Sequence, residues 1–230
     1  MPYRPDERQY RDFAVKSFKP EARESSEEQD ESYIVRGYFC TFNDPYELFE
    51  DYFEEIDPHA FDSCDMSDTI MQVNHDGFVY ARIRNQSLSI EFDEHGGHMT
   101  ADVSGSKRGR EELYEAIDNG LIDRMSFGFT IAADGLEWTE DNNGVIHTRI
   151  TKIDKLYDVS AIAGFPANDG TEISARSVLD GIRDAQKVQA EQAEAEQRAA
   201  EEAAEEERAA KEREDKLAML RLRAKRVSII

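Results

Sequence analysis

A serine lies within a run of alternating bulky and small residues, Met125-Ser126-Phe127-Gly128-Phe129. Successive side chains of an extended strand point to opposite faces. The run therefore predicts a strand with three bulky side chains on one face and Ser126 and Gly128 on the other. The bulky face would anchor the strand in a core. The other face would present a hydroxyl beside bare backbone, which suits a nucleophile with room for a substrate chain. A strand whose small residues pack under a neighbour has the same pattern.

A serine nucleophile needs a base, most often a histidine, and the chain has five histidines. Four of them fall in turns or on a polar strand face: His59, His95, His98 and His147. His75 differs because it follows a short extended segment and shares a face with Met71 and Val73, which places it toward the interior. It is either the base or a core histidine with its hydrogen bonds satisfied.

The acid that would orient such a base is Asp158, which interrupts the apolar run from Leu156 to Ala163. A carboxylate inside an apolar strand costs several kcal/mol unless it is paired. A histidine N–H would satisfy it, as in a catalytic triad. An ion pair with an arginine such as Arg149, or an edge strand facing water, would serve equally. Asp76 is a poor orienter for His75 because adjacent residues of an extended segment point to opposite faces.

Many short strands separated by turn residues surround these candidates. The pattern predicts a mainly β protein with flanking helices (α+β), built as a barrel or sandwich. One helix is expected over residues 108–119, where apolar residues recur at helical spacing and Gly120 provides a C-cap. Residues 46–56 mix acids with aromatics at helix-like or irregular spacing. The expected strands are residues 33–42, 71–76, 78–83, 88–92, 98–103, 125–130, 136–139, 145–153 and 156–163.

Both ends of the chain differ in composition from its middle. Residues 1–32 are charged and rich in turn formers, so we expect a largely disordered acidic arm in which Phe13, with Val15 and Phe18, docks at most as a short strand. Residues 33–176 form the expected globular domain. Residues 177–230 form a charged tail, and the stretch 185–216 is almost entirely helix-forming. The last turns of this tail carry apolar residues at coiled-coil spacing: Leu217, Leu220, Ala224 and Val227.

The charge of the chain limits its partners. Residues 1–179 carry 37 acidic and 17 basic residues, whereas residues 180–230 carry 13 and 11. A domain this acidic argues against nucleic acid as the main partner. No apolar run reaches the length of a membrane span, and the start of the sequence has no secretory h-region. The two cysteines, Cys40 and Cys64, have neither metal-site nor disulfide-framework spacing.

Several segments, in this order, resemble the prohead (capsid-maturation) serine proteases of tailed bacteriophages. The matching segments are Gly37-Tyr38-Phe39 to Phe42, Glu54-x-Ile56-x-Pro58-x-Ala60-Phe61, Asn74-His75-Asp76, Leu113-Tyr114 to Asn119-Gly120, Met125 to Phe129, Leu156 to Ser160, and Pro166-Ala167 with Thr171. They span residues 33–176. The resemblance implies a small assemblin-like β-barrel with flanking helices.

The resemblance also implies residue roles. Its Asn-His-Asp motif makes His75 the catalytic histidine, and its Ser-Phe-Gly-Phe motif makes Ser126 the nucleophile. The third residue is commonly Glu in a Tyr-Glu-Val-Ser motif, where this chain has the shorter Asp158. His59 also replaces the small residue usual in its turn. His95 or His98 is a fallback third member, because assemblin-like proteases use a second histidine.

The expected function is that of a serine endopeptidase that needs no cofactor or metal. Its substrates would be segments of the major capsid protein and scaffold, inside the procapsid in the host cytoplasm, without nucleic acid or membrane partners. A homodimer is compatible with the resemblance. Residues 1–32 and 177–230 are expected self-cleavage regions, and the tail is also a candidate scaffold or incorporation signal. Oxyanion donors are expected near Phe127 and Gly128, or from Arg124 or Arg149.

Two other classes stay open at this point. One is a non-catalytic scaffolding protein in which the helical tail drives assembly. The other is a metal-dependent hydrolase built on His95, His98 and nearby acids, although two ligands on a hairpin tip are a weak metal signal.

Overall fold

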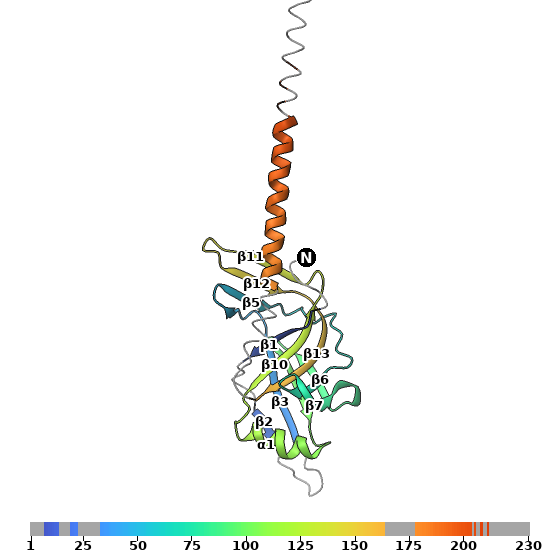
Figure 1. Cartoon of the computed structure of the whole chain (residues 1–230). Helices are drawn as coiled ribbons and strands as arrows, with labels where there is room; N and C mark the ends of the chain where they lie inside the picture. Colours follow the sequence, from blue (N-terminus) through green and yellow to red (C-terminus); the bar gives the residue numbers. More distant parts are fainter. Residues whose placement is uncertain are drawn as a thin grey trace, which may run out of the picture. The chain divides into compact units, whose positions relative to one another are not determined.

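A computed structural model describes residues 7–13, 19–22, 33–163 and 178–203, together with residues 205, 208 and 211. The described strands form three sheets, and helices are added to them (Figure 1). The prediction of a mainly β protein with helices is confirmed. Each sheet is open in this part of the chain, so none closes on itself as the expected barrel would.

The first sheet has the strand order β1-β10-β13-β6-β7. Its members are β1 (Gln9–Phe13), β10 (Arg124–Ile131), β13 (Ile153–Ile162), β6 (Ile70–Val73) and β7 (Asp76–Arg82). Strand β10 lies between β1 and β13 and pairs antiparallel with both, whereas β13 pairs parallel with β6. This sheet brings distant parts of the sequence side by side at its centre.

The second sheet has the order β11-β12-β5-β4, formed by β11 (Leu136–Glu140), β12 (Ile146–Ile150), β5 (Tyr52–Ile56) and β4 (Tyr46–Phe49). Its last two strands correct the expectation of helical or irregular structure over residues 46–56. The alternation is present, since every second residue of β5 is buried. One of these buried residues is Glu54. Because it is an acid, the alternation of apolar and polar residues that predicts a strand is interrupted in the sequence.

The third sheet has the order β2-β3-β9-β8, formed by β2 (Lys19–Ala22), β3 (Tyr33–Thr41), β9 (Gly96–Asp102) and β8 (Leu88–Phe92). All three pairings in it are antiparallel. The chain enters it from β7 through the short 3₁₀ turn η1 (Ile83–Asn85), which ends at a left-handed residue. This turn lies between β7 and β8, so the chain passes there from the first sheet to the third.

Strands β1 and β2 show that two parts of residues 1–32 are extended and paired, and β1 includes Phe13, for which a short strand was expected. The rest of the arm lies outside the described residues. Helical structure follows β9 as a π-helical turn, η2 (Gly109–Tyr114), and α1 (Glu115–Asp118), which confirms the helix expected there. The domain boundaries given above remain predictions.

Residues 178–203 are helical, as are residues 205, 208 and 211, so the expected long C-terminal helix is confirmed for this part of the chain. Residues 187–203 are exposed on every side of the helix, and Arg198 pairs with Glu194 one turn earlier at 3.1 Å. The apolar residues with coiled-coil spacing lie outside the described residues. None of the described helices is both long and apolar enough to cross a membrane.

An aromatic core joins the first and third sheets. Phe39 of β3 lies 5.6 Å from Phe127 of β10 between ring centroids, and Phe61 lies 6.0 Å from Phe39. Met125, Phe127 and Phe129 are completely buried, as the alternation along β10 predicts. Each such side chain contributes about 1.5–3 kcal/mol through burial. The core therefore holds β10 firmly and fixes which way its other face points.

Candidate active site

Strand β10 places Ser126 and Gly128 on the face opposite its aromatic residues. Its neighbours in register on β13 are Ser160 and Asp158, respectively. The hydroxyl is not exposed as the sequence suggested, because Ser126 has no solvent-accessible surface. His75 contacts it directly, and side chains from β13 and from residues 8–10 complete the site.

His75 lies in the two-residue turn between β6 and β7, and not on an inward strand face as expected. Asn74 and His75 have φ angles of +52° and +59°, as in the type I′ turns that join strands tightly. The turn is tied to β13, since the Asn74 N–H donates to the Ala161 carbonyl at 3.0 Å and the Ala163 N–H donates to Asn74 Oδ1 at 2.9 Å. The histidine side chain is 16% exposed and reaches over β10.

His75 connects the two other predicted residues. Its Nε2 lies 2.6 Å from Ser126 Oγ, and its Nδ1 lies 2.6 Å from Asp158 Oδ1. A carboxylate can only accept hydrogen bonds, so Nδ1 carries the proton that it donates to Asp158. In the neutral ring Nε2 then accepts from the Ser126 hydroxyl. The structure therefore brings together all three residues that the sequence singled out.

Asp158 lies on a central strand and is completely buried. Ser160 Oγ donates to Asp158 Oδ1 at 2.5 Å, and the guanidinium of Arg8 pairs with Oδ2. Burial alone would raise the pKa of Asp158. The hydrogen bonds from His75 and Ser160 and the charges of His75 and Arg8 outweigh burial and hold the pKa below its ordinary value. The carboxyl group therefore stays ionised, and its arginine partner is Arg8 instead of Arg149.

Gly128 gives this carboxylate its space. A Cβ atom at position 128 would lie 2.4 Å from Asp158 Oδ2 and 2.9 Å from the Arg8 guanidinium. The bare backbone that the sequence suggested for a substrate chain is thus occupied by the acid and its arginine.

The remaining candidates lie elsewhere. His59 is exposed and contacts Asp62 at 3.1 Å, while the rings of His95 and His98 pack against Tyr38. Among the described residues, no group of three or more His, Cys, Asp or Glu side chains is arranged to hold a metal ion.

The two arginines proposed as oxyanion donors differ in their surroundings. Arg124, at the start of β10, has its Nε 3.8 Å from Asp123. Arg149 belongs to the second sheet and is engaged by Glu55, Asp57 and Asn43.

Sequence reasoning missed three residues around the triad. Arg8 and Tyr10 belong to an arm expected to be disordered, and no local pattern pointed to them. The Tyr10 ring lies 4.5 Å from that of His75. Ser160 had a signal, since it falls two residues after Asp158 and so shares its strand face.

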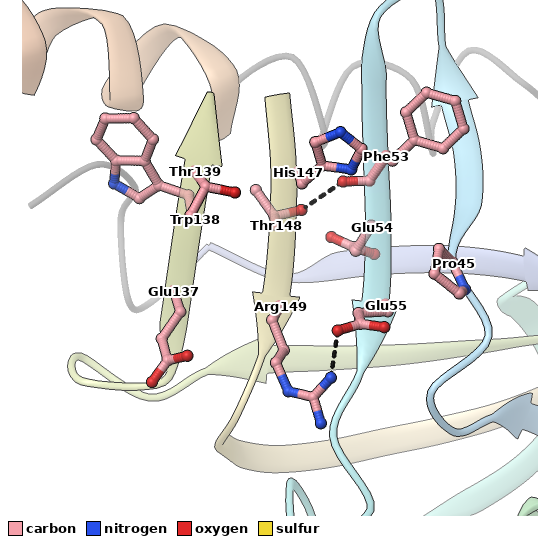
Figure 2. Close-up of a pocket in the computed structure, with 10 residues that line it drawn as sticks. All are labelled: Pro45, Phe53, Glu54, Glu55, Glu137, Trp138, Thr139, His147, Thr148 and Arg149. Carbon is pink, nitrogen blue, oxygen red and sulfur yellow. Dashed lines mark hydrogen bonds and ion pairs between the residues drawn. The ribbon is translucent and has the colours of Figure 1, made fainter. Parts of the chain in front are cut away.

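A hollow of about 290 Å³ lies on the second sheet, away from the triad. Figure 2 shows its lining on neighbouring strands, with Arg149 reaching to Glu55. The lining includes His147, whose ring stacks on Phe53 at 5.4 Å.

Comparison with known proteins agrees with the resemblance seen in the motifs. Residues 19–184 match the caudovirus prohead serine protease family, and this range includes all three triad residues. The chain therefore belongs to this family. It is 28% identical over 101 residues to the prohead protease of Enterobacteria phage HK97, a match that covers 44% of this chain and 42% of that protein. The matched region is thus less than half of the relative's length.

Among solved structures, the chain is similar to the bacteriophage T4 capsid assembly protease. That similarity has a TM-score of 0.40 and 11% sequence identity, and it covers 69% of this chain and 100% of the other.

Proposed function

We propose that this protein is a serine endopeptidase of capsid maturation that cuts peptide bonds by acyl transfer. The observation that carries the proposal is the bridging position of His75, whose two ring nitrogens lie 2.6 Å from Ser126 Oγ and 2.6 Å from Asp158 Oδ1. This is the order nucleophile, base and orienting acid that serine proteases require.

In this mechanism Ser126 Oγ attacks the carbonyl carbon of the scissile bond while its proton moves to His75 Nε2. Asp158 holds the ring in the correct tautomer and stabilises the imidazolium that forms. The tetrahedral intermediate collapses, and the departing amine takes the proton from Nε2. Water, deprotonated by the same nitrogen, then hydrolyses the acyl-enzyme and regenerates the Ser126 hydroxyl.

Family membership supports phage capsid proteins as the substrates, with cleavage inside the procapsid in the host cell. Segments of the scaffold and the chain's own ends, residues 1–32 and 177–230, are further proposed substrates.

Replacement of the nucleophile tests the function. The parent, Ser126→Ala and the control Ser89→Ala, which changes an exposed strand serine, are each co-expressed with capsid and scaffold proteins. Intact masses of all chains are then measured. We expect cleavage by the parent and by Ser89→Ala and full-length chains with Ser126→Ala. Equal trimming in all three would contradict the proposal. Assembly with uncut proteins in all three would favour the scaffolding alternative.

A further inference from the structure

Strand β1 lies before the residues of this chain that match the family. The family match begins at residue 19, whereas β1 covers Gln9–Phe13. The strand nevertheless pairs along the centre of the site, with Asp12 opposite Ser126 and Tyr10 opposite Gly128. A segment that precedes the matched residues thus lies beside the proposed nucleophile.

The backbone of β1 occupies the edge of β10 that a substrate would need. Strand β13 already takes the other edge of β10. An open strand edge presents N–H and C=O groups to which an extended peptide can add as a further strand. With β1 in place both edges of β10 are paired from Met125 to Phe129. The amides near Ser126 therefore lie between two strands.

Side chains of the same segment cover the base and the acid. Tyr10 packs on His75, and Arg8 pairs with Asp158 Oδ2 and lies over the Tyr157 ring, 4.7 Å from its centroid. Ser126 is left with no accessible surface. Acyl transfer requires a carbonyl carbon about 3–3.5 Å from Oγ, and a substrate cannot approach so closely while this segment is in place.

The opposite face of β1 is held by polar contacts that are suited to release. Arg11 is buried, and its Nε and Nη2 donate to the carboxylate of Glu54 at 2.5 and 2.8 Å. Gln9 is buried beside it. A buried ion pair adds little net stability, because the loss of hydration offsets its attraction. When the strand leaves, Arg11 regains water, and Glu54 keeps the hydrogen bond that it accepts from the Tyr46 hydroxyl at 2.5 Å.

From these contacts we propose that residues 7–13 form a blocking strand that holds the substrate-binding edge of β10. An extended peptide segment of the substrate takes its place during catalysis. This inference rests on the proposed function of the Ser126 site, and it adds an occupant and a means of control to that site.

A disulfide lock tests the proposal in the full-length chain. Gln9 and Phe129 are direct partners on β1 and β10, and such pairs lie within disulfide range. In the variant Gln9→Cys with Phe129→Cys, Ser126 is labelled with a fluorophosphonate, and the rate is followed by mass. We expect the labelling rate to be at least about tenfold lower after oxidation than after reduction. A factor of ten corresponds to the free energy of roughly one charge-assisted hydrogen bond, such as the one between Arg8 and Asp158. The two states share both substitutions, so any fold damage cancels. Equal rates would overturn the proposal.

A second variant opens the site without a crosslink. Tyr10→Ala removes the contact to His75 and keeps the ion pair between Arg8 and Asp158. Its control, Tyr38→Ala, removes a tyrosine packed on His95.

We expect labelling of Ser126 to rise about tenfold in the first variant and to stay at the parental rate in the control. An unchanged or reduced rate in the first variant would overturn the blocking strand. Capsid-protein cleavage that persists in Ser126→Ala would instead overturn the proposed function, so the two failures are distinguishable.

Discussion

The hollow on the second sheet and the triad on the first differ in how their polar groups are connected. In the hollow, the guanidinium of Arg149 is bound by two carboxylates, those of Glu55 and Asp57. At the triad, Asp158 acts on Ser126 through the ring of His75. The first arrangement ends in an ion pair. The second ends in a hydroxyl that can lose its proton. The connected polar groups thus lie on the first sheet and the hollow on the second.

The two regions also differ in their accessibility to solvent. The hollow is open, whereas Ser126 and Asp158 are completely buried. The hollow has the open, concave form of an ordinary ligand site, whereas the donors and acceptors that acyl transfer would need are connected at the covered site. Substitutions matched between the two regions test which of them peptide cleavage requires.

The largest expected effect comes from changing one carboxylate in each region to an amide. Asp158→Asn should lower the rate of peptide cleavage about 10⁴-fold, because an amide no longer holds the correct histidine tautomer. Glu55→Gln removes a charge from the hollow and should leave the rate within about twofold. Initial rates on purified capsid protein measure both. Similar losses in the two variants would refute the division between the regions.

A smaller loss of rate is expected from Gly128→Ala. The added methyl group displaces Asp158 Oδ2 or Arg8, and a misplaced catalytic group costs about 100-fold. Gly105→Ala is the matched control, because its added Cβ meets no atom within 4 Å. Cleavage rates and thermal unfolding separate the loss of geometry from the loss of fold. An active Gly128→Ala enzyme would show that the carboxylate position is not critical.

In the hollow, Arg149→Ala should affect stability and leave catalysis intact. Burial alone would raise the pKa of Asp57, but the backbone N–H of His59 and the guanidinium of Arg149 hold it below its ordinary value. A lowered pKa stabilises the fold above the unfolded-state pKa of about 3.9, and this stabilisation is lost as pH falls. We expect a loss of about 1 kcal/mol at pH 7 for this partly exposed pair.

Urea unfolding at several pH values measures this effect. The difference between Arg149→Ala and the parent should shrink as the pH falls below about 4. A difference that grows in acid would contradict the role given to the ion pair, and a loss of cleavage at pH 7 would link the hollow to catalysis.

The last prediction is that a thiol reagent has no effect on the cleavage rate. This result would separate a serine mechanism from a thiol mechanism. Burial raises the pKa of Cys40 and of Cys64 to about 12, so at pH 8 roughly one thiol in 10⁴ is ionised. Iodoacetamide at pH 8 should leave the cleavage rate unchanged over an hour, with little alkylation seen by mass. Rapid alkylation with inactivation would show that a cysteine takes part.

The candidate residues were predictable from the sequence to different degrees. Ser126 could be placed because bulky and small residues alternate along β10, and Asp158 because a lone acid in an apolar strand needs a partner. His75 was selected for a reason that the structure corrects. His75 lies in a turn with positive φ angles. The dipeptide Asn-His predicts such a turn less strongly than Asn-Gly does.

The covering of the site could not be predicted. Strand β1 is stabilised by partners far along the chain, such as Glu54 and β10. The local sequence of this charged segment gives no sign of that pairing. The ion pair between Arg11 and Glu54 also explains why β5 was not predicted, since Glu54 interrupts the apolar alternation of that strand. Local patterns thus identified the strands that fill their core faces with apolar side chains. They failed where a buried ion pair takes that place.

The long sequence separations within the site have a consequence for the newly made chain. His75 and Asp158 are 83 residues apart, and Arg8 and Asp158 are 150 residues apart. Contacts over such separations form slowly because long loops must close first. During synthesis β1 is made before β10 and has no partner until β10 emerges. The full set of contacts that joins His75 to Ser126 and Asp158 therefore forms only after residue 158 has been made, and β1 likewise waits for its partner β10.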